Sequence, residues 1–258
     1  MIIDLIKKII PSKFHPLNYF SQRAIKQLKG VVKQGPFKGM KYIDKAHVGF
    51  VCHKLTGTYE KEIQHIIHDE LNKSYDAIID VGSAEGYYAV GMALFGKSST
   101  VVSFEGTARG RELQIRLAKL NNVDHKISIK EYCDAESLYI EMSKFKDCLL
   151  ICDVDGFELA LLNINLNSHL SHTTMIIECH NHCYENMEND LMERFSKTHD
   201  IISIPVRKCV DYSDYPNPNF LYKIMPKKYK DFPIRETERA VEDTWLYLKP
   251  KKTALNIE

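Results

Sequence analysis

The chain has 258 residues, of which 44% are hydrophobic and 27% are charged, which is typical of a globular protein with one sizeable core. Because 35 basic residues stand against 34 acidic ones, the formal net charge of +1 gives no electrostatic argument for a nucleic-acid partner. The seven cysteines are an odd number without a Cys-x-x-Cys pair, which favours reduced thiols and a cytoplasmic location over a disulfide scaffold.

The chain begins with isoleucines and leucines on one side of a predicted amphipathic helix, residues 1–10, which ends at Pro11. Two interpretations stay open: a helix packed on the body of the protein, or a weak contact with the inner face of the membrane. Apolar runs all fall short of the ~20 residues that a membrane-spanning helix needs. We expect residues 1–70 to form a helical and irregular extension, with a helix at 59–71, and residues 71–258 to form the main domain.

From residue 77 onward, short apolar runs alternate with helical patterns. Several of the runs are apolar on successive residues, as expected when helices cover both faces of a sheet. Five strand–helix units in a row predict an α/β fold with a doubly wound parallel sheet. Two further strands are expected after these five units, at 201–206 and 245–248. The expected strands of the repeating units are 77–81, 100–105, 127–130, 148–153 and 175–179, and the expected helices are 87–95, 109–121, 136–145, 157–166 and 187–196.

The first expected strand leads into a glycine turn before a helix. Gly82 would let the backbone pass close to a ligand, and Gly86 would let the helix open against the strand. Nucleotide-like cofactors bind at turns of this kind. The predicted cofactor-binding residues here are Asp80, Gly82, Ser83, Glu85, Gly86 and Tyr87.

The second expected strand ends at Glu105, roughly 20 residues after the glycine turn. A carboxylate at this place can accept hydrogen bonds from both hydroxyls of a ribose, and the alternative is a solvated acid at a strand end. After the third strand, Asp134 either caps the next helix or, with Ala135, lies beside an adenine amino group. One residue could serve in both ways.

The fourth and fifth expected strands end in further acids and a histidine. Asp153, Asp155 and Glu158 follow the fourth strand, and Asp153 is the best placed for a polar site. The fifth strand ends with Glu178 and His180 on the same side of an extended chain. Because ligands of an open parallel sheet bind beyond the carboxyl ends of its strands, these groups are candidates for chemistry.

The sequence does not predict a metal site, although it contains two sets of potential metal ligands. Cys179, His180, His182 and Cys183 fall within five positions, whereas zinc sites usually combine two separated short motifs. A divalent cation held by Asp153, Asp155 and Glu178 remains a weaker alternative.

The chain resembles class I S-adenosylmethionine-dependent methyltransferases, specifically their FkbM-like branch, over roughly residues 55 to 205. The segment around Asp153 is the most specific to the family, and Asp155 stands where family members commonly carry Glu, which puts a direct ligand role there in doubt. The matching stretches are residues 79–88, Phe104-Glu105, 152–158 and 177–180.

The resemblance implies a seven-stranded sheet whose last two strands form an antiparallel hairpin. It also implies S-adenosylmethionine as cofactor and O-methylation of a sugar, a glycan or another small hydroxylated metabolite, as in polysaccharide biosynthesis. His180 would be the general base and Asp153 the second candidate, while the alternative for His180 is a core histidine bonded to the backbone.

Two rival functions follow from the same pattern. One is a non-catalytic cofactor-binding or assembly protein in a glycan-synthesis complex. The other, a nicotinamide dehydrogenase, is disfavoured because its turn is Gly-x-Gly-x-x-Gly, whereas this chain has three residues between Gly82 and Gly86. Neither the acceptor nor the oligomeric state follows from the sequence.

Overall fold

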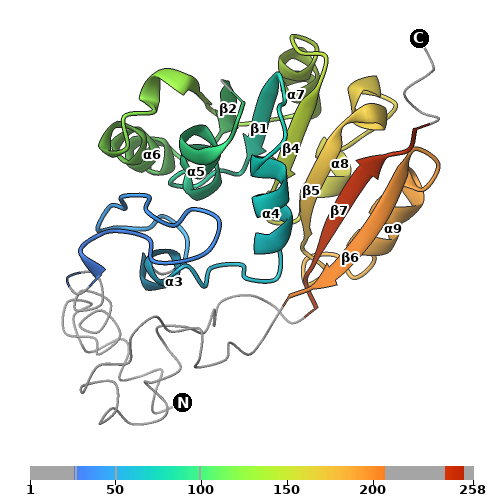
Figure 1. The fold of residues 1–258 in the computed structure, drawn as a ribbon. Helices are drawn as coiled ribbons and strands as arrows, with labels where there is room; N and C mark the ends of the chain where they lie inside the picture. The colour runs from blue at the N-terminus through green and yellow to red at the C-terminus, as the bar shows by residue number, and fades with distance from the viewer. Residues whose placement is uncertain (1–25, 27, 50, 99, 207–241, 253–258) are drawn as a thin grey trace.

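The structure is a computed structural model that describes residues 26, 28–49, 51–98, 100–206 and 242–252 (Figure 1). The predicted helix at 1–10, with its membrane-surface alternative, lies outside the described residues, as does the segment 207–241. Within the described part, no helix is both long and apolar enough to cross a membrane.

A single mixed sheet of seven strands forms the centre of the fold, in the order β3-β2-β1-β4-β5-β7-β6 (Figure 1). The first five strands run parallel, and β7 is antiparallel to both of its neighbours. The predicted doubly wound sheet with an antiparallel C-terminal hairpin is therefore confirmed. The strands are β1 (Ala77–Val81), β2 (Val101–Phe104), β3 (Ile127–Lys130), β4 (Cys148–Cys152), β5 (Thr174–Cys179), β6 (His199–Pro205) and β7 (Thr244–Pro250).

The direction in which the chain winds reverses at β1, which lies between β2 and β4. Val81, the last residue of β1, pairs with Phe104 of β2 on one side and with Cys152 of β4 on the other. The carboxyl ends of these three strands are thus level, and the loops that leave them face one space. In open α/β sheets this switch point is where ligands bind.

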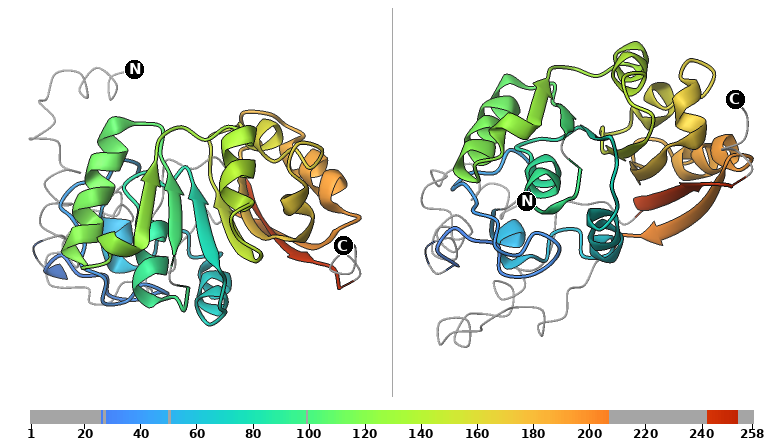
Figure 2. Two further views of the ribbon diagram at one scale, coloured as in Figure 1. Left: turned by 90° about the horizontal axis from the view of Figure 1, so that it is seen from above. Right: turned by 45° about the horizontal axis from the view of Figure 1, so that its top comes forward.

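Helices cover both faces of the sheet, as the two views in Figure 2 show. Ile78 and Ile79 are adjacent in β1 but belong to two separate buried clusters, because successive strand residues point to opposite faces. One cluster contains side chains of α4 (Gln64–Leu71), α5 (Tyr87–Phe95) and α6 (Ala108–Leu120). The other contains side chains of α7 (Ala135–Met142), α8 (Glu158–Leu161) and α9 (Met187–Phe195).

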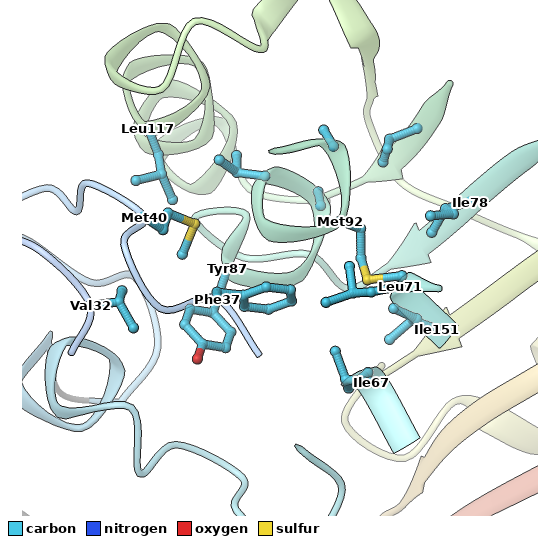
Figure 3. Close-up of a cluster of buried hydrophobic side chains, with 14 of the residues drawn as sticks. Val32, Phe37, Met40, Ile67, Leu71, Ile78, Tyr87, Met92, Leu117 and Ile151 are labelled. Carbon is cyan, nitrogen blue, oxygen red and sulfur yellow. The ribbon is translucent and has the colours of Figure 1, made fainter. Parts of the chain in front are cut away.

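The segment before β1 packs into the first of these clusters (Figure 3). Phe37 is fully buried, and its ring centroid lies 5.1 Å from that of Tyr87 in an edge-on contact. A Cβ atom on Gly91 of α5 would lie 2.6 Å from the Phe37 ring, so the helix and the segment fit closely. The segment continues into α3 (Val51–Thr56). The domain boundary predicted near residue 70 stays a prediction.

Two expected helices are shorter than the sequence pattern indicates. The helix expected at 157–166 covers only Glu158–Leu161, because the backbone then turns at Asn163, whose side chain accepts a hydrogen bond from the amide of Asn165. The helix expected at 59–71 begins at Gln64, because Glu60 has a positive φ of 46° that a right-handed helix does not allow. The other helices and strands begin and end within a few residues of their predicted bounds.

Candidate functional site

A cavity of about 540 Å³ lies at the carboxyl ends of the first four strands. It brings together most of the residues that the sequence predicted to bind a cofactor, while Glu85, Gly86 and His180 do not line it. His47, Lys54 and Tyr59 line it as well and come from the segment before β1, where no sequence motif marked them. The predicted residues in its wall are Asp80, Gly82, Ser83, Tyr87, Glu105, Asp134, Ala135 and Asp153.

Gly82 is needed for a reason that the sequence did not reveal. Its φ is +82°, and a Cβ atom there would lie 1.6 Å from the carbonyl oxygen of Asp153. The close approach is therefore made by the chain leaving β4, and not by a ligand alone as the glycine pattern suggested. Gly86, with φ +88°, begins α5, and a Cβ atom there would lie 2.6 Å from Cγ of Gln114.

Asp80 supplies a buried carboxyl group at the end of β1. It is 3% exposed, and its Oδ2 has no hydrogen-bond partner among the described residues although the residue lines the cavity. Burial raises the pKa of this carboxyl to about 7, opposed by a hydrogen bond from the Ala89 amide and helped by the charge of Glu105. A cationic or hydrogen-bond-donating part of a ligand would satisfy this oxygen.

Glu105, directly after β2, is held in a fixed orientation beside the glycine turn. Its Oε2 accepts from the Ala84 amide at 2.9 Å. Its Oε1 accepts from the Thr107 amide at 2.7 Å and from the Thr107 hydroxyl at 2.6 Å. Since each carboxylate oxygen has two lone pairs, one lone pair on Oε2 remains for a hydroxyl of a ligand, and a second hydroxyl would replace the Thr107 hydroxyl on Oε1. His47 lies on the same side, with Nε2 4.0 Å from Oε1.

Asp134 caps α7, because its Oδ1 accepts from the Ser137 amide at 2.8 Å. One of the two predicted roles of this residue is thus confirmed. Asp134 and Ala135 also line the cavity, so the contact with an adenine remains a prediction.

The Glu85 carboxylate does not line the cavity but is buried behind the turn. It accepts hydrogen bonds from the ammonium group of Lys54, from the Tyr42 hydroxyl at 2.6 Å and from the His47 amide at 2.9 Å. Burial alone would raise the pKa of Glu85, but the Lys54 charge and these donors outweigh it and lower the pKa. Glu85 therefore fixes the segment that carries His47 and Lys54 to the glycine turn.

Asp153 and His180 lie together at the ends of β4 and β5, with Nε2 of His180 3.5 Å from Oδ1 of Asp153. Asp153 lines the cavity, whereas His180 is buried behind it. Nδ1 of His180 is 2.6 Å from Oε1 of the fully buried Glu158, which fixes the ring. Nε2 is also 3.5 Å from Oδ1 of the exposed Asp155.

The charges of this pair depend on each other. Burial opposes protonation of His180, but the hydrogen bond to Glu158 and the charges of Asp153 and Glu178 outweigh it and raise its pKa to about 9. Burial and the nearby Glu178 carboxylate raise the pKa of Asp153 well above its usual value. At neutral pH His180 is therefore mainly an imidazolium, and Asp153 is a stronger base than an exposed carboxylate.

Two groups of potential metal ligands share Asp153. One combines it with Asp155 and His180, and the other with Glu60 and Glu178, each with ligand atoms within 4.8 Å of one another. The weaker alternative predicted from the sequence, Asp153 with Asp155 and Glu178, is thus divided between two groups. Among the described residues, Cys179 and Cys183 belong to neither group.

No protein-family model matches the chain, and no curated protein matches it either. Among solved structures, it is similar to an O-methyltransferase from Bacillus cereus in complex with SAH, with 12% identity, a TM-score of 0.47 and 96% of each chain covered. It is also similar to a ribosomal protein L11 methylase from Lactobacillus delbrueckii subsp. bulgaricus, with 15% identity, a TM-score of 0.45, and 74% and 79% of the two chains covered. These similarities are remote, so the fold rests on the strand order and the site on its own geometry.

Proposed function

We propose that the protein is an S-adenosylmethionine-dependent O-methyltransferase. The observation that carries the proposal is Glu105. It is a buried carboxylate at the end of β2, oriented by Ala84 of the glycine turn, and it lines a cavity at the point where the sheet order reverses. A carboxylate so placed suits a ribose diol, and the level ends of β1 and β4 leave room for the rest of a nucleoside.

The other polar groups of the cavity fit the remaining parts of the same cofactor. Asp134 and Ala135 line the cavity after β3 and would contact an adenine, and the buried Oδ2 of Asp80 has no hydrogen-bond partner among the described residues. S-Adenosylmethionine carries an ammonium group and a sulfonium centre, and the carboxylates of Asp80 and Asp153 suit these cations. When bound, the cofactor supplies an electrophilic methyl group.

The protein would align the acceptor oxygen with the methyl carbon and the sulfur, and would remove the acceptor's proton. Asp153 is the carboxylate that reaches the cavity, and His180 lies 3.5 Å behind it with a raised pKa. We therefore propose Asp153 as the group that accepts the proton, with the His180 imidazolium holding its position. This reverses the order of the two candidates that the sequence suggested.

The acceptor class is proposed on the resemblance to the FkbM-like branch: a hydroxyl of a sugar, a glycan or a small metabolite. An isolated hydroxyl is a poor nucleophile, and the raised pKa of Asp153 suits a base for such a group. The expected location in the cytoplasm belongs to the same proposal.

Two measurements test the proposal. Calorimetric titration with S-adenosylhomocysteine should show one site, and transfer of a labelled methyl group to a panel of sugar acceptors should show turnover. Binding without turnover on any acceptor would favour the rival, a cofactor-binding or assembly protein. The absence of binding would contradict both.

A further inference from the structure

A cysteine and a histidine in the turn after β5 and an aspartate directly before β7 form a chain of contacts outside the wall of the cavity. Cys183 is exposed, and its Sγ lies 3.2 Å from Nε2 of His182. Nδ1 of His182 lies 2.9 Å and 3.0 Å from the two carboxylate oxygens of Asp243, which is 2% exposed. Neither the cofactor site nor the proposed transfer uses this group.

The carboxylate of Asp243 determines which nitrogen of His182 carries the proton. Because a carboxylate accepts only, Nδ1 donates to Asp243, and the lone pair of Nε2 faces the Cys183 thiol. Asp243 is itself held, because the His182 amide donates to Oδ1 at 3.2 Å and the Asn181 side chain donates to the neighbouring Glu242 carbonyl at 2.7 Å. The Cys183 thiol, the His182 ring and the Asp243 carboxylate are thus connected by successive contacts as a nucleophile, a base and a group that orients the base.

The thiol depends on this base for its reactivity. Desolvation and the carboxylates of Glu158, Asp243 and Asp155 raise the pKa of the Cys183 thiol. A thiolate is therefore not the resting form, and the proton has to leave as the sulfur attacks. Nε2 of His182, 3.2 Å from the sulfur, is a closer acceptor than the Asp155 carbonyl oxygen, which is 4.0 Å away.

The surroundings favour attack on sulfur over attack on a carbonyl group. Acyl transfer needs N–H donors for a developing oxyanion. The amides of Cys183 and Tyr184, beside the sulfur, both donate to the His180 carbonyl, at 2.9 and 3.2 Å. Displacement at a disulfide sulfur places its charge on a leaving thiolate and needs no such donors.

We propose that Cys183 is a site of reversible mixed-disulfide formation with low-molecular-weight disulfides, with His182 as base and Asp243 as its positioning residue. The Cys183 sulfur attacks one sulfur of the disulfide, the new S–S bond forms as the old one breaks, and Nε2 takes the thiol proton. The other half leaves as a thiolate, which takes a proton from the imidazolium. Excess thiol reverses the exchange.

The modified sulfur would lie against the loop that borders the cavity. A Cβ atom on Gly156 would lie 2.9 Å from Cβ and 3.3 Å from Sγ of Cys183, and the neighbouring Asp155 and Phe157 line the cavity. A tripeptide attached to Cys183 has to be accommodated over this loop. We expect the protein with the mixed disulfide at Cys183 to transfer methyl groups at least tenfold more slowly than the reduced protein. This expectation rests on the proposed function.

The probe is glutathione disulfide at pH 7, with the modified cysteine identified by peptide mass spectrometry. We expect Cys183 to react at least tenfold faster than the half-buried Cys133 and than N-acetylcysteine in solution. His182→Ala should lower the rate at least tenfold, and free imidazole should restore part of it, which a purely structural effect would not produce. Asp243→Asn should lower the rate with little rescue, since the ring of His182 remains in place. Cys183→Ser should abolish the label on the peptide that contains residue 183.

Equal rates for Cys183 and N-acetylcysteine, or an unchanged rate in His182→Ala, would overturn the assignment. His182 is exposed, so His182→Ala should fold, and thermal melting followed by circular dichroism checks both this variant and Asp243→Asn. Labelling of Cys183 is measured by mass spectrometry and needs neither cofactor binding nor turnover. A failure of labelling can therefore be distinguished from a failure of the proposed function. Full turnover by the mixed disulfide would overturn the predicted effect on the cavity.

Discussion

Glu105 and Asp80 are both buried and both line the cavity, but their hydrogen bonding differs. Both oxygens of Glu105 accept from the protein, whereas Oδ2 of Asp80 has no partner among the described groups. The Glu105 carboxylate is thus oriented before a ligand binds. Oδ2 of Asp80 is removed from water without a partner, and a ligand that donates a hydrogen bond to it would reduce this desolvation cost. Each leads to a separate experiment.

Replacing Glu105 by Ala should weaken binding of S-adenosylhomocysteine at least tenfold. The change removes hydrogen bonds to a charged acceptor, each worth about 1.5–3 kcal/mol. Calorimetric titration measures the affinity, and Glu112→Ala, on the exposed side of α6, is the matched control. Unchanged affinity in a folded Glu105→Ala protein would contradict the assignment to the ribose.

Asp80→Asn should make the protein more stable above pH 7 and weaken cofactor binding. The folded-state pKa of about 7 lies above the ordinary value of 3.8, so the carboxyl contributes stability at low pH that is lost as the pH rises through about 7. The full effect is about 4 kcal/mol at most. Urea unfolding at pH 5 and pH 8 measures the part of the effect between pH 5 and about pH 7, which is about 3 kcal/mol at most. An equal change at both pH values would refute the explanation.

His180 should affect the pH dependence of turnover near pH 9. The raised pKa means that the imidazolium, and the stability it contributes, are fully present below about 6.5 and lost as the pH rises through about 9. If Asp153 accepts the proton, turnover should fall above pH 9, because His180 then loses the charge that holds Asp153 in position. Asp153→Asn should lower turnover by about 10²–10⁴-fold. A rise in turnover through pH 9 that disappears in His180→Gln would instead identify His180 as the base.

At the scale of elements, the Lys54–Glu85 pair connects α3 to the turn between β1 and α5. Both side chains are at most 2% exposed. Removing one partner leaves an uncompensated buried charge, so Lys54→Met should lower the free energy of unfolding by about 3–5 kcal/mol. Arg116→Met, which removes an exposed ion pair to Asp44, should cost about 0–1 kcal/mol.

Denaturant unfolding measures both variants. The double variant Lys54→Met/Glu85→Leu should recover part of the loss, because it removes the orphaned carboxylate. A Lys54→Met protein as stable as Arg116→Met would mean that the pair does not hold α3 in place.

The parallel strands were predictable because their signal is local. The central strands are apolar runs whose burial on both faces leaves a continuous pattern, as β1 and β4 demonstrate with every residue buried, whereas the edge strand β3 is only partly buried. Acids directly after such runs could be assigned to the sheet's carboxyl edge, which brought Asp80, Glu105 and Asp153 into one cavity.

Contacts across long distances in the chain could not be predicted. Glu85 has the position of a cofactor ligand in the glycine turn, but its partner Lys54 is 31 residues away without a motif. His182 and Cys183 belong to a local cluster of potential zinc ligands in the sequence, and nothing in the sequence connects them to Asp243, which is 61 residues from His182. Asn163 limits the end of α8 and Glu60 limits the start of α4 through local backbone conformations that hydrophobic periodicity does not record.

At the scale of the whole molecule, β7 is the last strand in sequence but lies between β5 and β6. It contributes the fully buried Trp245, the single tryptophan of the chain. Deleting residues 244–258 should abolish cooperative unfolding, because β5 loses a neighbour and β6 loses its pairing strand.

Circular dichroism melting tests this truncation, and deletion of residues 253–258, beyond the described part of the chain, is its control. In the full chain, Trp245 fluorescence should change in the same transition as circular dichroism. A shortened protein that still melts cooperatively near the wild-type temperature would show that the sheet does not need β7.

The position of β7 also has a consequence for how the protein is made in a cell. A ribosome releases the N-terminal part first, so the growing polypeptide can assemble β1 to β5 while Thr244–Pro250 has not yet been synthesised. Until then β5 has an open edge, which is a template for pairing with other nascent chains. Premature termination before residue 244 would leave that edge exposed permanently, and such products should be preferred clients of chaperones and proteases.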